Sequence, residues 1–256
     1  MDVPWPFPKL PNEAWSRKSR VAIISVALAS KLWSEWLNKV KIHNEEIMHN
    51  ALDSRPKDTP LITVSNHYSC VDDPVLWGTL RWRHGNNLRW CPTAADVCFT
   101  KPWHATFFSL GRCVPVIRGE GVYQKGMDFL LERLNEGAWV HVFPEGKVNA
   151  AHDVMRLKWG VGRLIAECKK VPMVIPMFHL GMDSVLPNKT PYIPRVGQNV
   201  TVVYGTPLDL TELVAKIKAL KFNPMEQRKA ITDRIQDEFA VMRILAEKLH
   251  YGTSET

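Results

Sequence analysis

The sequence predicts an α/β fold: a single domain with a largely parallel central sheet flanked by helices, preceded by an N-terminal interfacial membrane helix. After residue 50, short apolar runs typical of buried strands alternate with longer runs of helical periodicity. This alternation is the pattern that builds parallel sheets with crossover helices. The 256 residues, 45% of them hydrophobic and 23% charged, can enclose one large core. We therefore expect a membrane-associating segment over residues 1–50 and one globular domain over residues 51–256.

The first fifty residues predict a helix that lies in the plane of a membrane. Residues 4–8 alternate proline with aromatic residues and cannot form a helix. Basic residues at positions 17, 18 and 20 precede an apolar stretch over 21–29, which is shorter than the roughly 20 residues of a spanning helix. Helical periodicity continues to Val40 with tryptophan and lysine interspersed, a composition that favours interfacial binding. A first helix of the globular core is the alternative, and the acid-poor opening also permits an organellar targeting signal.

The globular domain is expected to contain five strands and five helices. The strands cover residues 61–64, 113–117, 139–143, 173–177 and 200–204, and the helices cover residues 74–83, 123–135, 158–167, 210–221 and 224–249. The last helix carries apolar residues at three-to-four spacing, which predicts that it packs on the core. In parallel sheets, ligands bind beyond the carboxyl ends of the strands. A site is therefore expected in the turns that follow the strands.

The turn after the first expected strand holds a histidine and an aspartate, His67 and Asp72. Imidazole is suited to accept a proton near neutral pH. A carboxylate at its other nitrogen would fix the tautomer and stabilise the imidazolium. Because proline favours the first helical position and the residue before it caps the helix, Pro74 predicts Asp73 as the N-cap and leaves Asp72 free to face His67. Alone, this pair is unspecific, since buried structural histidines are common.

Two later turns carry further polar residues. Arg118 leaves the strand 113–117 beside a glycine, and arginine suits bidentate binding of phosphate, although an exposed salt bridge is an equal alternative. Residues 143–147 form the turn Phe-Pro-Glu-Gly-Lys. Glu145 could accept a hydrogen bond from a substrate hydroxyl or hold Arg118, and Gly146 permits a tight turn. An exposed turn carboxylate is the alternative for Glu145.

Composition and missing motifs exclude several classes of site. The chain has no Gly-x-Ser-x-Gly elbow, Walker loop or dinucleotide-binding glycine motif, so Ser69 and Cys70 are weak candidates for a covalent nucleophile. Five widely spaced cysteines argue against a disulfide framework or a zinc site, and neither a metal nor a cofactor is predicted. Ten tryptophans and a net charge of +7 favour a membrane with anionic lipids. Nucleic acid is not expected, because no base-reading motif accompanies the charge.

Four ordered blocks of the sequence resemble those of the glycerolipid acyltransferase family. They are His67-x4-Asp72, the segment 111–118 that ends at Arg118, the Phe-Pro-Glu-Gly turn at 143–146, and the Val-Pro-Met-Val-Ile-Pro run at 171–176. The resemblance implies an acyltransferase domain over 51–256 that acts on phospholipids and lysophospholipids. It implies His67 as the catalytic general base, Asp72 as its orienting partner, and Arg118, Glu145 and Gly146 as residues that position the acceptor's phosphate and glycerol.

One departure from the family pattern bears on the acyl donor. Biosynthetic members usually follow the Phe-Pro-Glu-Gly turn with Thr-Arg-Ser, whereas this chain has Lys147, Val148 and Asn149. In this respect it resembles the branch of CoA-independent transacylases that remodel cardiolipin in mitochondrial membranes facing the intermembrane space. That resemblance implies acyl transfer from phospholipids such as phosphatidylcholine to monolysocardiolipin. An acyl-CoA-dependent lysophospholipid acyltransferase, a phospholipase and a non-catalytic membrane-binding protein are the alternatives.

Overall fold

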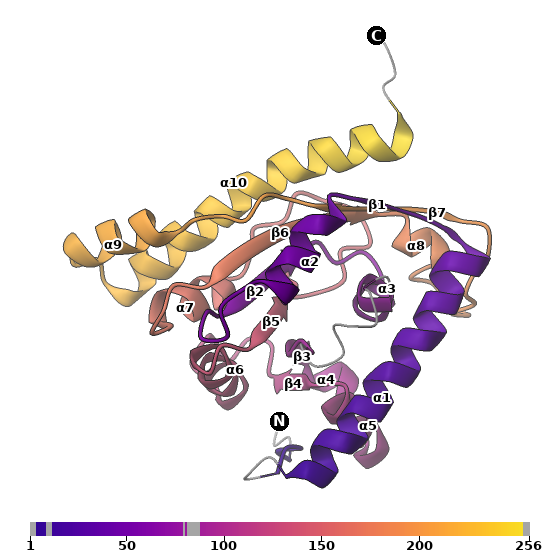
Figure 1. Ribbon diagram of the computed structural model, residues 1–256, viewed down its shortest axis with the longest axis horizontal. Helices are drawn as coiled ribbons and strands as arrows, with labels where there is room; N and C mark the ends of the chain where they lie inside the picture. The colour runs from indigo at the N-terminus through magenta and orange to yellow at the C-terminus, as the bar shows by residue number, and fades with distance from the viewer. Residues whose placement is uncertain (1–3, 9–11, 79, 81–87, 253–256) are drawn as a thin grey trace.

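A central five-stranded sheet organises the chain in the computed structural model, which describes residues 4–8, 12–78, 80 and 88–252. The strands lie in the order β1-β7-β6-β2-β5 (Figure 1), with the bounds Lys39–His43, Asn199–Tyr204, Met173–Leu180, Leu61–Ser65 and Trp139–Val142. β2 pairs in parallel with β5 and β6, and β1 pairs in parallel with β7, whereas β6 and β7 are antiparallel. The predicted α/β fold with a largely parallel sheet is therefore confirmed.

β2 lies inside the sheet, between β6 and β5, and all of its residues are buried. A strand covered on both faces needs an almost continuous apolar run, which Leu-Ile-Thr-Val supplies. Of its two polar residues, Thr63 accepts a hydrogen bond from Trp139 Nε1 at 2.9 Å and contacts His141 Nδ1 at 2.8 Å. The Ser65 hydroxyl donates to the Asn66 carbonyl at 3.0 Å. The buried polar groups of the strand are thus paired, and β2 carries the chain rigidly to the turn that follows it.

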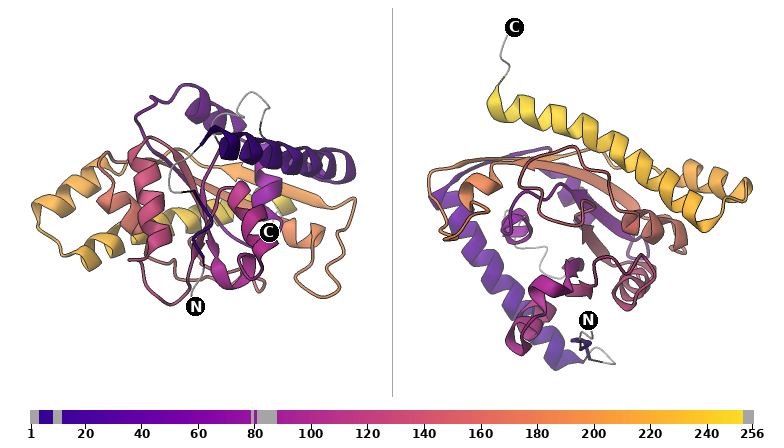
Figure 2. Two further views of the ribbon diagram at one scale, coloured as in Figure 1. Left: turned by 90° about the horizontal axis from the view of Figure 1, so that it is seen from below. Right: turned by 180° about the vertical axis from the view of Figure 1, so that it is seen from behind.

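Helices cover both faces of the sheet (Figures 1 and 2). One face packs against α6, α7, α9 and α10, with the bounds Lys125–Asn135, Gly160–Glu167, Thr211–Ala219 and Pro224–Tyr251. The other face packs against α2, α3 and α8, with the bounds Glu45–Asp53, Asp72–Gly78 and Met182–Val185. The apolar stripe of the last helix packs on the first face, as predicted, because Ile231, Ile235 and Phe239 are buried there. Part of the predicted helix 74–83 lies outside the described residues.

A second, two-stranded sheet corrects the place of one predicted strand. β3, Cys91–Ala94, pairs in parallel with β4, Cys113–Val116. The strand expected at 113–117 therefore forms, but its expected place in the central sheet was wrong. Each of these strands contains a proline, Pro92 or Pro115, and a residue without an N–H is confined to sheet margins. The small sheet joins the central one through Trp90, whose N–H donates to the Trp139 carbonyl at 2.9 Å.

The N-terminal helix α1 spans Glu13–Leu32 and ends before the predicted boundary. A π-helical turn, Trp33–Leu37, follows it. Asn38 then donates to the Trp33 carbonyl at 3.1 Å and accepts the N–H of Gln198 at 2.9 Å, which turns the chain into the edge strand β1. The helix predicted to run to Val40 was therefore wrong at its end, because pairing with β7 overrides helical periodicity. Among the described residues, no helix combines the length and the apolar character that crossing a bilayer requires.

α1 buries two of its serine residues and exposes several of its apolar ones. Ser19 and Ser30 are buried against the rest of the protein, and Ser34 is buried in the turn that follows. The exposed apolar stripe consists of residues at helical spacing on the opposite side: Val21, Leu28, Leu32 and Trp36. Trp36 is 80% exposed. A helix of a globular core normally shows the reverse polarity.

Gly78 allows α1 to pack closely on α3, and its replacement by alanine is expected to destabilise the fold. A Cβ atom at position 78 would lie 2.6 Å from Cβ of Ser30 and 3.0 Å from the backbone nitrogen of Lys31. Overpacking of this kind typically costs about 1–3 kcal/mol. Urea denaturation of Gly78→Ala should show a lower midpoint. Gly160→Ala is the matched control, because its Cβ would meet only the flexible end of Met127, at 3.3 Å, and an equal loss in both variants would contradict the packing argument.

Candidate active site

The carboxyl ends of β2, β5 and β6 bring together two of the predicted site residues, His67 and Glu145, and one that was not predicted, His179. His67 follows β2, Glu145 follows β5, and His179 lies near the end of β6. The ends of β2 and β6 are tied by Asn66, whose side-chain amide donates to the His179 carbonyl and accepts the His179 N–H, both at 2.8 Å. These bonds fix the start of the His67 turn relative to the sheet.

His67 and Asp72 form the pair that the sequence predicts. His67 Nδ1 lies 2.9 Å from Asp72 Oδ2, so Nδ1 carries the proton and donates it to the carboxylate. Nε2, the other ring nitrogen, has no hydrogen-bond partner among the described residues, and the side chain is 20% exposed. This tautomer leaves the lone pair of Nε2 available to a substrate hydroxyl.

The Asp72 carboxylate is held by the turn that it closes. Asp72 is fully buried, and Oδ2 also accepts the backbone N–H groups of Tyr68 at 2.7 Å and Ser69 at 2.9 Å. His179 Nε2 lies 3.5 Å from the same oxygen and 2.9 Å from the Asn66 carbonyl. Oδ1 is buried without a hydrogen-bond partner among the described residues. Several donors to one oxygen stabilise the ionised carboxylate in this buried position.

The backbone of His67 is clamped on both sides by the turn after β5. Its N–H donates to Glu145 Oε1 at 3.0 Å, and its carbonyl accepts the N–H of Asn149 at 2.6 Å. The imidazole also stacks on the Phe143 ring, with centroids 4.2 Å apart. The segment 143–149 therefore lies beside the His67 imidazole and also holds the backbone of His67 in place. Nothing in the spacing of the sequence shows this clamp, because it joins residues from two different strands.

Glu145 and Gly146 occupy a tight, half-enclosed turn. Glu145 is buried, and burial raises the pKa of its carboxyl, an effect that the His67 N–H partly offsets. The exposed turn carboxylate considered from the sequence is therefore wrong. Gly146 has a φ of 73°, the left-handed region that favours glycine. The structure pairs Arg118 with Asp96 on the protein surface, which is the exposed salt bridge considered as an alternative. Glu145 accepts the His67 N–H instead, so the contact with Arg118, one of two roles considered for Glu145, is not formed.

Asp73 does not cap a helix, which corrects the expectation from Pro74. Helix α3 already begins at Asp72. The Asp73 carboxylate instead accepts Trp77 Nε1 at 2.7 Å and Arg89 Nε at 3.0 Å, and a second nitrogen of Arg89 completes a two-pronged ion pair. Burial would raise the pKa of Asp73, but the Arg89 guanidinium outweighs it and holds that pKa below its usual value.

Arg89 is the residue of the site that the sequence does not show. Its side chain is nearly buried and also donates to the Gly111 carbonyl at 3.1 Å. Through Asp73 it holds the first turn of α3, in which Asp72 lies. The partners are 16 residues apart and lie outside any common motif. No strand was expected beside Arg89, so no pattern in the sequence pointed to it.

The two weak candidates for a covalent nucleophile are poorly placed for that role. The Ser69 residue is buried, and its hydroxyl donates to the Leu186 carbonyl at 3.0 Å. Cys70 is exposed, but desolvation and the neighbouring Asp72 raise the pKa of its thiol, which lowers the thiolate fraction. The arrangement therefore favours a histidine base acting on a substrate hydroxyl.

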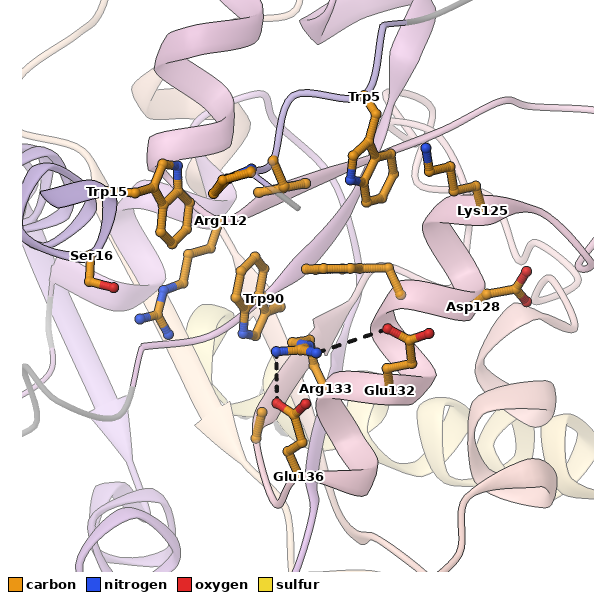
Figure 3. A pocket seen from close by; sticks show the side chains of 14 residues that line it. Trp5, Trp15, Ser16, Trp90, Arg112, Lys125, Asp128, Glu132, Arg133 and Glu136 are labelled. Carbon is orange, nitrogen blue, oxygen red and sulfur yellow. Dashed lines mark ion pairs between the residues drawn. The ribbon is translucent and has the colours of Figure 1, made fainter. Parts of the chain in front are cut away.

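A pocket of about 650 Å³ lies elsewhere in the fold, between the N-terminal segment and α6 (Figure 3). Trp5 and Phe7 line it and contact the Phe129 ring, Trp5 edge-on and Phe7 by stacking. Its acidic side chains are paired, Glu132 and Glu136 with Arg133 (Figure 3). Asp128, which also lines it, pairs with Arg163. None of the predicted catalytic or substrate-binding residues lines it. The pocket is part of the packing that attaches the N-terminal segment to the domain.

The chain belongs to the Acyltransferase family, whose model matches residues 39–179, and this membership identifies it as an acyltransferase. The acyltransferase PlsC of Thermotoga maritima has the same fold, with a TM-score of 0.61 over 91% of this chain and 84% of that one, at 18% identity.

Within the family, the chain is similar to the tafazzins. It is 44% identical to tafazzin of Drosophila melanogaster over 97% of this chain and 67% of the relative, and 37% identical to taffazin of Dictyostelium discoideum over 75% and 70%. It is also 33% identical to N-acylphosphatidylethanolamine synthase of Arabidopsis thaliana, over 89% of this chain and 92% of the relative. The predicted membership of the glycerolipid acyltransferases, on the tafazzin side of that family, is confirmed.

Proposed function

We propose that this acyltransferase is a CoA-independent phospholipid–lysophospholipid transacylase that remodels the acyl chains of cardiolipin. The donor would be a phospholipid such as phosphatidylcholine, and the acceptor monolysocardiolipin. The observation that carries the proposal is the free Nε2 of His67, held in the basic tautomer by Asp72. The similarity to tafazzins and the Lys147-Val148-Asn149 sequence after the turn support the choice of donor.

In the proposed reaction, His67 Nε2 removes the proton from the free hydroxyl of the lysophospholipid. That oxygen attacks the carbonyl carbon of the donor's acyl ester, forming a tetrahedral intermediate. The intermediate collapses by breaking the bond to the donor's glycerol oxygen, which takes the proton back from His67. Asp72 stabilises the imidazolium in between. General-base assistance of this kind contributes about 10²–10⁴-fold, and holding both lipids at one site adds an effective-molarity term.

The substrate-binding roles are part of the same proposal. We assign the acceptor's phosphate to Arg118, which is half-exposed and forms an ion pair with the exposed Asp96; a phosphate can displace such a surface partner. Glu145 and Gly146 would face the glycerol, since the turn that contains them touches His67 directly. In this proposal Glu145 holds the backbone of His67 and also lies beside the glycerol of the bound lysophospholipid.

Membrane association is proposed through the exposed apolar stripe of α1. An amphipathic helix with tryptophan and basic residues binds in the interfacial plane, with its apolar face in the headgroup–acyl boundary. The net charge of +7 favours anionic lipids such as cardiolipin. By similarity to the tafazzins, we place the protein on mitochondrial membranes that face the intermembrane space, as a monotopic protein.

A second candidate differs in the acceptor. The similarity to a plant N-acylphosphatidylethanolamine synthase, over nearly that protein's full length, favours acyl transfer to the amine of phosphatidylethanolamine. The same base could remove the proton from an attacking amine. The two proposals share the donor and differ in the bond formed, an ester in one case and an amide in the other.

Acyl exchange without CoA tests the proposal. We expect the purified protein to move labelled acyl chains from phosphatidylcholine to monolysocardiolipin in mixed vesicles, and the products are separated by chromatography and mass spectrometry. A strict need for acyl-CoA would establish the acyl-CoA-dependent alternative. Free fatty acid in excess acceptor would indicate a phospholipase, and an amide product would indicate the second candidate. No acyl transfer under any of these conditions would leave a membrane-binding protein.

A further inference from the structure

Between α8 and β7 lies a run of nine consecutive exposed residues, 189–197, which projects from the edge of the molecule (Figure 2). This 189–197 loop carries three large apolar side chains, Tyr192, Ile193 and Val196, which are 60%, 63% and 57% exposed. Single exposed apolar residues are ordinary on a protein surface, but several within one short loop indicate a contact surface. The loop is therefore a candidate for binding a partner.

The start of the loop is fixed to the turn that holds the candidate base. The Asn188 side-chain amide donates to the Tyr68 carbonyl at 2.6 Å, and the Ser69 hydroxyl donates to the Leu186 carbonyl at 3.0 Å. Tyr68 and Ser69 are also the residues whose N–H groups bind the Asp72 carboxylate. The exposed apolar residues begin four positions after Asn188, which is at most about 14 Å of extended chain. Whatever the loop binds is therefore held close to this turn.

The charges of the loop indicate an anionic partner. Lys189 and Arg195 stand on either side of the loop tip, Tyr192-Ile193, and no acidic residue occurs from position 184 to position 198. An aromatic and an aliphatic side chain flanked by cations are typical of segments that bind where anionic headgroups meet acyl chains. The composition therefore favours a membrane that contains anionic lipids.

The backbone of the tip also suits lipid. Pro191 precedes the tip and Pro194 follows it. A backbone N–H that enters the acyl region without a partner costs free energy, and proline has no N–H. Its fixed φ also reduces the conformational entropy that is lost when a loop becomes ordered. These features favour a bilayer over a folded protein partner, which could offer acceptors to N–H groups.

We propose that the 189–197 loop inserts its tip into an anionic bilayer and so holds the His67 turn at the lipid surface. This inference rests on the proposed transacylase function and adds to it the segment that brings the base to its substrates. The contact is separate from that of the α1 stripe and does not depend on it. The reacting hydroxyl and ester groups of phospholipids lie at the boundary between headgroups and acyl chains. A loop anchored at that boundary keeps the catalytic turn near both groups while the lipids stay in the membrane.

Vesicle binding by Tyr192→Ser/Ile193→Ser tests the inference. On sedimented vesicles of phosphatidylcholine and cardiolipin, we expect the partition coefficient to fall by about tenfold or more, because two large apolar side chains no longer become buried in lipid. The matched control is Val241→Ser/Ile244→Ser, which removes two exposed apolar residues from α10; its binding should stay unchanged. Equal binding by the wild type and the loop variant would overturn the inference, and so would equal losses in both variants.

The charge variant Lys189→Gln/Arg195→Gln tests the choice of an anionic bilayer. It should bind vesicles that contain cardiolipin several-fold more weakly than the wild type, because each cation near an anionic surface contributes to binding. On vesicles of phosphatidylcholine alone, the two proteins should bind equally. The same loss on both kinds of vesicle, or on neither, would contradict the role assigned to the charges.

An added tryptophan reports the depth of the loop independently of the affinity. When all of the protein is bound, lipids brominated in the upper acyl chain should quench the fluorescence of Ile193→Trp by a larger fraction than that of Val241→Trp, which carries the same number of tryptophans. Equal quenching would place the tip outside the lipid and overturn the proposal. Dissociation of an oligomer in Tyr192→Ser/Ile193→Ser without lipid would identify a contact between two copies of the chain, and would also overturn it.

Failure of this inference is distinguishable from failure of the proposed reaction. The Tyr192→Ser/Ile193→Ser variant should retain acyl exchange in detergent micelles, where docking on a bilayer is not needed. His67→Ala should bind vesicles as the wild type does, whatever its activity. Loss of vesicle binding with normal micellar activity therefore reports on the loop, and normal binding without any acyl transfer reports on the chemistry.

Discussion

Replacing His67 by alanine is expected to lower the rate of acyl transfer by at least about 10²–10⁴-fold, the usual contribution of a general base. The variant should remain folded, because the backbone contacts of residue 67 to Glu145 and Asn149 do not involve the imidazole. Acyl exchange measured on mixed vesicles, together with circular dichroism and thermal melting, checks both statements. Activity within a few-fold of the wild type would show that another group removes the proton.

Asp72→Asn is the companion to this variant. It preserves the shape of the side chain and an oxygen for the N–H groups of Tyr68 and Ser69, but it cannot stabilise an imidazolium at His67. We therefore expect a large fall in kcat with little change in the melting temperature. Because both residues act in one step, the double variant should be about as slow as His67→Ala alone. Additive losses would contradict a shared role.

Replacing Arg89 by methionine is expected to lower the free energy of unfolding by about 3–5 kcal/mol, because it leaves the nearly buried Asp73 carboxylate without its counter-charge. Urea denaturation measures this directly. The matched control is Arg118→Met, which breaks the ion pair with Asp96. Both partners of that pair are well exposed, so the loss of stability should be no more than about 1 kcal/mol. Similar losses in both variants would contradict the burial argument.

The stability difference at position 89 should depend on pH. The pKa of Asp73 is lower in the folded protein than its ordinary value, so the ion pair contributes fully above the unfolded pKa. This contribution is lost as the pH falls through the folded pKa. In Arg89→Met, burial without the guanidinium raises the pKa of Asp73, so protonation relieves the buried charge of the variant at a higher pH. The difference between the two proteins should therefore be largest where Asp73 is ionised in both and shrink as the pH falls. If the difference in the free energy of unfolding grew as the pH fell, the pKa of Asp73 would not be lowered by Arg89 as assigned.

The predicted strands correspond to β2, β4, β5, β6 and β7, whereas β1 and β3 were missed. β2 and β6 are long apolar runs, which only burial explains. β1 alternates basic and apolar residues and resembles a continuation of α1 until its pairing with β7 is known. β3 contains Pro92 and is stabilised by its partner strand rather than by its own composition. Apolar runs along the sequence therefore identify strands, whereas strands of mixed composition such as β1 and β3 are recognised only from the strand with which they pair.

The candidate site shows the same division. His67 and Asp72 lie within one turn, and their spacing is visible along the chain. The assignment of Asp73 as a cap failed because helix-capping rules consider only neighbouring residues, whereas a guanidinium 16 positions away competes for the carboxylate. The clamp on His67 by Glu145 and Asn149 joins positions on either side of a long crossover. Contacts of that kind follow from the packing of strands.

The two hydrogen bonds that clamp the His67 backbone make hydrogen exchange a measure of how often the base is correctly placed. Because folding immobilises the base, the entropy of orienting it is lost once rather than in every turnover. The amide protons of His67 and Asn149 are both bonded within this clamp. Their exchange with deuterium therefore requires the clamp to open, and each opening removes the base from its working position. Slow exchange at these two amides would serve as a direct record of the catalytically competent fraction, in solution or on a vesicle.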